Sequence, residues 1–112
     1  MQINIKKTIT IAAELETDID EKFSALAKFI KHFDANGEAE MWIEISRTTK
    51  HHKKGELFKV VANLRLPHKV LRAEEYAEDI RTAIDEARNV LRTEIDKYKT
   101  RFVELDKKKL AK

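Results

Sequence analysis

The chain has no cysteine, one proline and two glycines among its 112 residues. Without cysteine, the protein can hold no disulfide framework, no thiolate zinc site and no cysteine nucleophile. With Gly37 and Gly55 as its only glycines, it can form no glycine-rich phosphate-binding loop. No apolar run is long enough for a signal peptide or a membrane-spanning helix, so the sequence predicts a soluble, cytoplasmic protein.

Catalytic and metal-binding groups are also scarce. No nucleophile, base and orienting group stand at a recognisable spacing, and His32 and His68 are isolated histidines. His51 and His52 are adjacent, but neighbouring residues of a strand or loop point apart and the surrounding lysines repel a cation. We therefore expect no enzyme activity, no cofactor, no metal ion and no small-molecule substrate.

Charge is what the chain has in abundance, since 38% of its residues are Asp, Glu, Lys or Arg. The formal net charge is only +3, so the distribution of the charges matters more than their total. Residues 41–68 carry 6 basic and 2 acidic side chains, whereas residues 1–40 carry 5 basic and 8 acidic ones. The length suits one domain, which we place at residues 1–106, followed by a basic C-terminal tail at residues 107–112.

Patterns of apolar residues predict the secondary structure of the first part of the chain. A short strand is expected at residues 2–6, with Ile9 and Ile11 as candidates for its extension. From residue 13 to residue 33, apolar residues recur at steps of three and four, which predicts an amphipathic helix. Acidic residues near the start of this helix and basic residues near its end complement the helix dipole. Residues 34–37 are expected to form a turn.

Three strands and a second helix are predicted for the rest of the chain. Alternating apolar residues indicate one strand over residues 41–46 and another over residues 58–66, joined by a polar, basic hairpin loop. Pro67 cannot donate a hydrogen bond to a neighbouring strand, so it ends the second of these strands. A short fourth strand at residues 69–73 precedes a long helix over residues 74–109. The order β-α-β-β-β-α predicts an α+β fold, with two helices packed on one face of a four-stranded sheet.

The long second helix is the most informative stretch, because it carries two separate stripes. Its apolar stripe faces the core and consists of Ile80, Ile84, Ala87, Leu91, Ile95, Tyr98, Phe102 and Leu105. Arg88, Arg92 and Lys99 follow Arg81 by 7, 11 and 18 residues. A rotation of about 100° per residue aligns these four side chains within roughly 20°, and we call them the cationic row. A row of cations beside the core stripe matches a polyanionic ligand.

Two further features have either an RNA-binding or a purely structural interpretation. The predicted hairpin loop contains a basic cluster, which either contacts phosphates or is merely solvated. This cluster consists of Lys50, His51, His52, Lys53 and Lys54. Trp42 is predicted on the sheet face opposite Met41 and Ile43, where it either stacks on a nucleotide base or simply covers the strand surface.

Several segments carry a more specific signal. They are Gly55-Glu56-Leu57-Phe58-Lys59, Leu64-Arg65-Leu66-Pro67, Val70-Leu71-Arg72-Ala73-Glu74-Glu75 and Asp79-Ile80-Arg81-Thr82-Ala83-Ile84-Asp85, continued by Ala87-Arg88, Leu91 and Lys97-Tyr98-Lys99. With Lys22-Phe23 and residues 26–28, they resemble the ribosome hibernation-promoting factors, also called ribosome-associated inhibitors or sigma modulation proteins. The resemblance covers nearly the whole chain. The predicted order of elements agrees with the fold of that family, which has the layout of a double-stranded-RNA-binding domain.

The resemblance implies a function and a set of contacts. It implies binding of the small ribosomal subunit in the channel used by mRNA and tRNA, with silencing of translation in starvation or stationary phase. Long members add a C-terminal dimerising domain, and since the sequence ends before one could begin, we expect the short form. The rRNA contacts that the resemblance implies are Lys22, Lys28, Arg88, Lys97 and Lys99. Arg81 and Arg92 are nominated by helix geometry alone.

Three positions depart from the family pattern. Arg81 stands where an aromatic residue is usual, Thr93 where a basic residue is usual, and Ala12 where a threonine usually caps the first helix. These departures bear on whether Arg81 and Thr93 contact RNA.

Two alternatives remain open at this point. The arginines of the cationic row could pair with carboxylates such as Asp85 instead of with phosphates. The long helix could also belong to a protein adaptor that pairs with another helix, and the surplus apolar residues would then be Phe102, Val103 and Leu105. We favour RNA binding on the family resemblance, and the chemistry agrees with it, since Lys and Arg neutralise phosphates and release counterions without base recognition. We expect the free protein to be a monomer.

Overall fold

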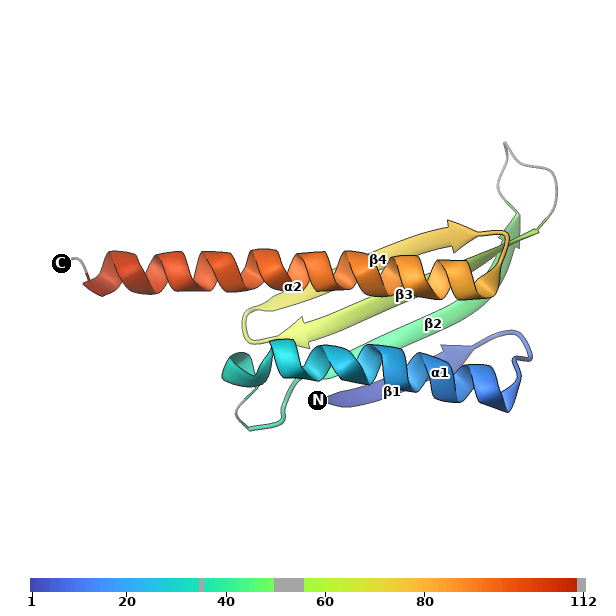
Figure 1. The fold of residues 1–112 in the computed structure, drawn as a ribbon, viewed down its shortest axis with the longest axis horizontal. Helices are drawn as coiled ribbons and strands as arrows, with labels where there is room; N and C mark the ends of the chain where they lie inside the picture. The colour runs from blue at the N-terminus through green and yellow to red at the C-terminus, as the bar shows by residue number, and fades with distance from the viewer. Residues whose placement is uncertain (35, 50–55, 111–112) are drawn as a thin grey trace.

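A four-stranded β-sheet forms one layer of the molecule (Figure 1). The computed structural model describes residues 1–34, 36–49 and 56–110, apart from the side chains of residues 49, 56 and 102–110. The strands lie in the order β1-β2-β3-β4, with β1 parallel to β2 and the other neighbours antiparallel. Their bounds are β1 (Gln2–Lys7), β2 (Glu40–Thr49), β3 (Glu56–Leu66) and β4 (Lys69–Ala77).

Two helical segments cover one face of this sheet, as Figure 1 shows. The first consists of α1 (Ala13–Ser24) and two 3₁₀ turns, η1 (Ala25–Phe29) and η2 (Lys31–Phe33), and the second is α2 (Ile80–Leu110). This arrangement confirms the predicted α+β fold and its β-α-β-β-β-α order. With 31 residues, α2 is about 46 Å long, and its last turns extend beyond the end of the sheet (Figure 1).

Alternation along the strands places their apolar side chains between the sheet and the helices. Met41, Leu64 and Leu71 lie side by side on β2, β3 and β4, and none is more than 2% exposed. The helical segments close this core with residues from one face of each. These are Leu15, Ile19 and Phe23 of α1, Leu26 and Ile30 of the 3₁₀ region, and Ala83, Ile84, Ala87, Leu91 and Ile95 of α2. The core therefore fixes which side of α2 faces the sheet and which side faces α1.

The first helix is shorter than its periodicity predicted. Of the helix predicted over residues 13–33, only the part to Ser24 is α-helical. In the 3₁₀ region that follows, the N–H groups of Ile30 and Phe33 donate to carbonyls three residues earlier. Apolar steps of three and four suit both windings, so the pattern could not distinguish them. The tighter winding sets the ring of Phe33 edge-on against Tyr98 of α2, with centroids 5.0 Å apart.

The fourth strand is longer, and the second helix begins later, than predicted. Residues 74–77, predicted as helix, instead continue β4. Glu74 is held in the sheet by Lys59 of β3, whose Nζ lies 3.2 Å from Glu74 Oε1. Asp79 then caps α2, because its Oδ2 accepts the N–H of Thr82 at 3.1 Å. Glu74 and Glu75 therefore belong to a strand, and the Asp79 cap fixes the start of the helix.

The first strand ends at Lys7 and does not extend through Ile9 and Ile11. The N–H of Thr8 still donates to the carbonyl of Ile45 at 3.1 Å, and the chain then leaves β2 for α1. Ile9 and Ile11 pack, partly buried, against the core from this connection. Their spacing reflects burial, not strand pairing.

Both predicted turns lie at the expected places. Pro67 and His68 form the two-residue loop between β3 and β4, in which His68 has a φ of 65°. At the turn before β2, the N–H of Gly37 donates to the carbonyl of Asp34 at 3.0 Å. Gly37 has a φ of 69°, which a residue without Cβ adopts without strain.

Candidate RNA-binding surface

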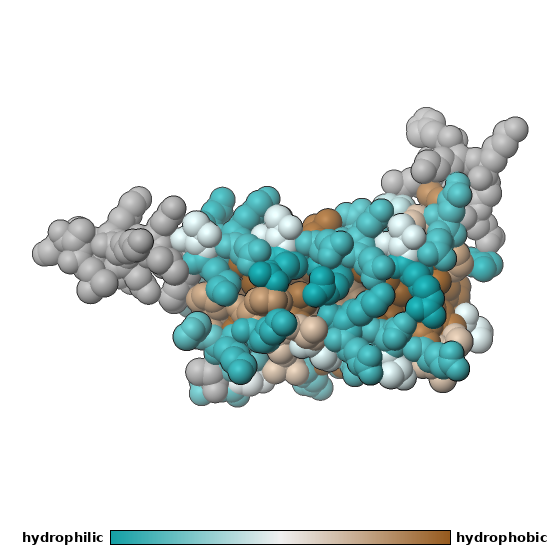
Figure 2. Space-filling view, viewed as in Figure 1, coloured by the Kyte–Doolittle hydropathy of each residue, from teal (hydrophilic) through white to brown (hydrophobic). Residues whose placement is uncertain are grey.

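The cationic row lies along the side of α2 that faces α1 and η1. Arg81 contacts Asp18 of α1, and Arg92 contacts Phe29 of η1. A groove of about 480 Å³ lies between the helices, lined by Glu21, Lys22, Ala25, Asp85, Arg88 and Asn89. Figure 2 shows this side of the molecule, where hydrophilic side chains cover both helices and apolar ones are visible between them. We call this feature the inter-helix groove.

Two ion pairs cross from one helix to the other. Arg81 Nη1 lies 2.8 Å from Asp18 Oδ2, and Lys22 Nζ lies 2.6 Å from Asp85 Oδ1. Between 33% and 55% of each of these side chains is exposed, so solvent screens both pairs and each contributes at most about 1 kcal/mol. The pairs orient the two helices, and a phosphate could compete for either cation.

Arg88 differs from its neighbours because its charge is not offset by a carboxylate among the described residues. Its Nη1 donates to Asn89 Oδ1 at 3.3 Å, which is a contact with a neutral amide. The side chain is half-buried and lines the inter-helix groove opposite Lys22. Arg88 is therefore the arginine of the row without a carboxylate partner among the described residues, in a groove that is also lined by the carboxylates of Glu21 and Asp85.

Arg92 is held by two contacts. Its Cζ lies 3.4 Å from the centre of the Phe29 ring, and its Nε donates to Asp96 Oδ1 and Oδ2 at 3.2 and 3.3 Å. Lys28, also in η1, places its Nζ 5.0 Å from the centre of the same ring. Arg92 and Lys28, both predicted as RNA contacts, thus meet at one aromatic side chain.

The remaining predicted site residues are not gathered at the inter-helix groove. Lys97 follows Arg81 by 16 residues, which places it about 160° around α2 from the row, and its Nζ lies 3.5 Å from Glu94 Oε1. Lys99 continues the row toward the end of α2 and is half-buried. The loop cluster of Lys50, His51, His52, Lys53 and Lys54 lies outside the described residues, as do the side chains of Phe102, Val103 and Leu105.

The alternative of ion pairing within the row holds for two of its three arginines. Arg81 pairs with Asp18 across the groove, not with Asp85, and Arg92 pairs with Asp96 one turn further along α2. The helical spacing of Arg92 and Asp96 could have indicated the second pair. The first pair, and the contact of Arg92 with Phe29, join segments about 60 residues apart, and no local spacing could have predicted them.

The opposite face of the sheet is covered by polar and charged side chains. Trp42 lies on this face, as predicted, and is 39% exposed, with the Arg65 guanidinium 5.5 Å from its ring. Arg65 also pairs with Glu40 at 2.8 Å. A hydrogen bond from Lys59, aided by Tyr76, lowers the pKa of Glu74, and the same bond raises the pKa of Lys59. Cations on this face are thus paired with carboxylates, as Arg65 is with Glu40 and Lys59 with Glu74.

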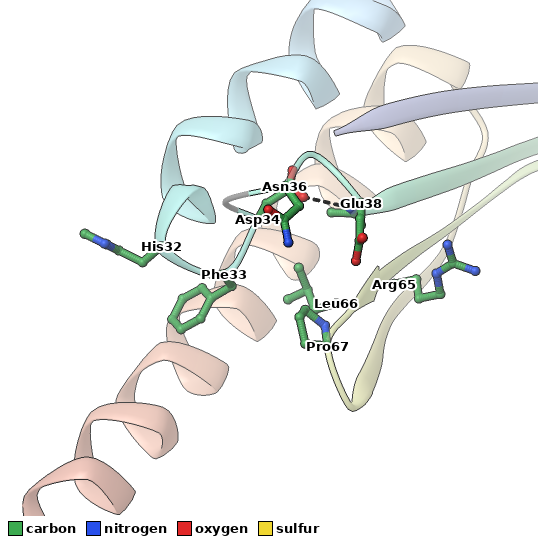
Figure 3. A pocket seen from close by; sticks show the side chains of 9 residues that line it. His32, Phe33, Asp34, Asn36, Glu38, Arg65, Leu66 and Pro67 are labelled. Atoms are coloured by element: carbon green, nitrogen blue, oxygen red, sulfur yellow. Dashed lines mark hydrogen bonds between the residues drawn. The ribbon is translucent and has the colours of Figure 1, made fainter.

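A second cavity, of about 390 Å³, lies between the turn after η2 and the β3–β4 hairpin (Figure 3). Asp34 at its edge is 8% exposed, and its Oδ1 accepts the N–H of Ala39 at 2.8 Å, while its Oδ2 lies 3.0 Å from the Met1 ammonium. Burial acts to raise the pKa of Asp34, but these donors hold that pKa below its ordinary value. The carboxylate therefore serves the fold at this edge, where it ties the turn to β2.

The described part of the chain was also compared with what a metal site and a membrane-spanning helix require. Within it, no group of three or more His, Cys, Asp or Glu side chains is placed to hold a metal ion. None of the helices described combines the length and the apolar composition needed to cross a membrane. The inter-helix groove, with cations from both helices along it, is the surface that we take as the candidate site.

Comparison with known proteins gives a family and a fold. A model of the family described as Sigma 54 modulation protein / S30EA ribosomal protein matches residues 2–103. A ribosomal subunit interface protein from Coxiella burnetii is similar with a TM-score of 0.68 and 20% identity, over 89% of this chain and 99% of that chain. The N-terminal domain of Protein Y from Thermus thermophilus is similar with a TM-score of 0.64 and 21% identity, over 87% and 94%. These two likenesses show the fold, and a comparison with curated proteins gives no match.

Proposed function

The chain belongs to the Sigma 54 modulation protein / S30EA ribosomal protein family, and we propose that it binds the small ribosomal subunit in the mRNA and tRNA channel and silences translation under stress or in stationary phase. The family match over residues 2–103 carries this proposal. A protein of the same fold is described as a ribosomal subunit interface protein, which supports the ribosome as the partner. A ribosomal partner places the protein in the cytoplasm.

The cations around the inter-helix groove supply the chemistry of this binding. Arg88 and Lys22 line the groove from opposite helices, so a phosphate between them would contact both. Each phosphate that is neutralised releases condensed counterions, which gives affinity without reading a base. Arg81 and Lys22 would exchange their exposed carboxylate partners for phosphates at little cost, because such surface pairs are weak.

The fold presents these cations on an elongated body whose shape suits insertion into folded RNA. The Cα positions extend over 57 × 31 × 17 Å. Both helices lie on the same face of the sheet (Figure 1), and their side chains Lys22 and Arg81 are partly exposed. A channel in RNA offers phosphates on several sides, so its shape selects a ligand whose cations are spread in this way. Lys28 and Lys99 would extend the contacts beyond the groove in the direction of the end of α2. Lys97, about 160° around α2 from the row, would reach a phosphate on another side. The basic cluster at residues 50–54 is proposed as a further contact.

Cosedimentation with separated ribosomal subunits tests the proposal. We expect the protein to travel with small subunits in a sucrose gradient and to be released as the salt concentration rises. About five phosphate contacts predict that log affinity falls with log salt at a slope of about −3.5 to −4.5. In cell-free translation, the same protein concentrations that saturate small subunits should stop synthesis. A protein adaptor that pairs helices would remain at the top of the gradient at all salt concentrations.

A further inference from the structure

Arg92 is fixed in an orientation that its role as a cation does not require. A Cζ position 3.4 Å from the centre of the Phe29 ring is the contact distance of two stacked planar groups. The Nε edge is held by both carboxylate oxygens of Asp96, at 3.2 and 3.3 Å. The side chain is still 37% exposed. One flat face of the guanidinium therefore lies against the Phe29 ring and its Nε edge is held by Asp96, while part of the side chain stays accessible to solvent.

The other two arginines of the cationic row lack this arrangement. Arg81 is 55% exposed and is held through Nη1 alone by Asp18. Arg88 donates through Nη1 to its neighbour Asn89. Within the described part of the chain, Arg92 is the one arginine of the row that stacks on an aromatic ring. The three residues thus allow a comparison between guanidinium groups of equal charge and different orientation.

We propose that Phe29 and Arg92 form a nucleobase-binding platform, on which an unpaired base of the bound RNA stacks against the side of the guanidinium that faces away from Phe29. This inference rests on the proposed binding of ribosomal RNA. RNA-binding proteins stack unpaired bases on aromatic rings and on guanidinium planes, and the contact tolerates any base because every base has a π-face. Phe29 below and Asp96 at the edge hold the guanidinium flat before RNA arrives, so little side-chain entropy is lost on binding.

A base is a better ligand for Arg92 than a phosphate. Both oxygens of Asp96 occupy the Nε edge, so a phosphate at that edge would have to displace Asp96, whereas a base can stack on the plane of the guanidinium without displacing it. Arg88 lies one helical turn earlier, about 6 Å along the axis, with a neutral partner, and suits a phosphate. Lys28 supplies a further cation 5.0 Å from the Phe29 ring centre. A single nucleotide could therefore place its phosphate at Arg88 and its base on Arg92, which requires an unpaired base.

The simpler explanation is that Arg92 covers the exposed edge of a half-buried aromatic ring with its own flat surface. The two explanations differ in what they require of the ligand. If Arg92 only covers Phe29, RNA binding depends on charge alone, and a backbone without bases binds as well as a complete strand. If Arg92 stacks on a base, removing the bases weakens binding even though the phosphate charge is unchanged.

The test compares a 12-nucleotide oligoadenylate with an abasic ribose-phosphate strand of the same length and charge, by fluorescence anisotropy. We expect the wild-type protein to bind the oligoadenylate about 10-fold or more tightly than the abasic strand. Arg92→Lys keeps the charge and removes the plane, so it should bind both strands with the affinity that wild type shows for the abasic one. Arg101→Lys, at an exposed arginine of α2 outside the cationic row, is the matched control and should retain the preference. Phe29→Leu should also lose the preference for bases while keeping a native melting transition. If Phe29→Leu proves unstable, the result for Arg92→Lys decides the test.

Two outcomes would overturn the platform. One is a wild-type protein that binds both strands equally, and the other is an Arg92→Lys variant that keeps the wild-type preference for bases. The same preparations are also sedimented with small subunits, so that the proposed function is tested separately. Wild type that fails to sediment with small subunits would overturn the ribosomal function, and the oligonucleotide preference would still decide whether Arg92 binds bases.

Discussion

Reversal of the charge at Arg88 should weaken binding to the small subunit more than it weakens the fold. Arg88 lines the inter-helix groove, and its guanidinium has a neutral contact, Asn89 Oδ1 at 3.3 Å. No carboxylate has to be displaced before this cation meets a phosphate. Arg88→Glu therefore removes one attraction and adds one repulsion at the proposed binding surface.

The size of the effect follows from the exposure of the site. Two unit charges 4 Å apart interact by about 1 kcal/mol in water and by more in a partly desolvated groove. Losing an attraction and gaining a repulsion should then cost at least about 2 kcal/mol, or about 30-fold in affinity. Glutamate has a helix propensity close to that of arginine, and a new like-charge contact with Asp85 costs a few tenths of a kcal/mol. The free energy of unfolding should fall by less than about 1 kcal/mol.

Affinity should be measured by equilibrium binding of labelled protein to purified small subunits at several salt concentrations, together with thermal melting. The lost phosphate contact should also make the salt slope shallower by about 0.7 to 0.9. Glu86→Lys is the matched control, because Glu86 is exposed on a different side of α2 and its charge changes by the same amount in the opposite direction. An Arg88→Glu protein with wild-type affinity and wild-type salt slope would refute the role of the inter-helix groove.

Three further predictions concern the fold. Asp34 has a lowered pKa, so its contribution to stability is full above its ordinary pKa of 3.8 and is lost as the pH falls through the lower folded-state value. In Asp34→Asn, this loss of stability on acidification should disappear from melting curves recorded at low pH, and the free energy of unfolding at neutral pH should fall by about 1 kcal/mol. Phe23 is fully buried, and Phe23→Ala should lower the free energy of unfolding by about 3 to 5 kcal/mol in urea titrations, in contrast to a change below about 0.5 kcal/mol for the exposed Lys31→Ala. Light scattering of the free protein at micromolar concentration should give a monomer mass, and a stable dimer would instead favour the adaptor.

The fold could be predicted from the sequence because alternation and helical periodicity report burial directly. Met41 and Ile43 are both buried on the face opposite Trp42, as their spacing indicated. The boundaries could be predicted less well, because they depend on particular hydrogen bonds. Asp79 caps α2, and nothing in the apolar pattern distinguishes a helix that starts after this cap from one that starts at residue 74, as predicted.

The cationic row could be located from helical spacing, but the state of each cation could not. Spacing on one helix finds partners one turn away, as with Arg92 and Asp96. It cannot find Asp18 beside Arg81 or Phe29 beneath Arg92, since these contacts depend on how α1 and the 3₁₀ turn pack against α2. That packing, which the sequence pattern leaves unspecified, decides which arginine offers a free charge and which offers a flat surface.

Competition with mRNA and tRNA tests the central proposal most directly. Because the chain has no cysteine, a single Lys69→Cys substitution at the exposed start of β4 allows one fluorophore to be attached. The labelled protein is titrated with vacant small subunits and with small subunits that already hold mRNA and tRNA. Binding in the channel predicts an affinity at least about 10-fold lower for the loaded subunits, with recovery when mRNA and tRNA are removed. Equal affinity for vacant and loaded subunits would contradict the proposed site.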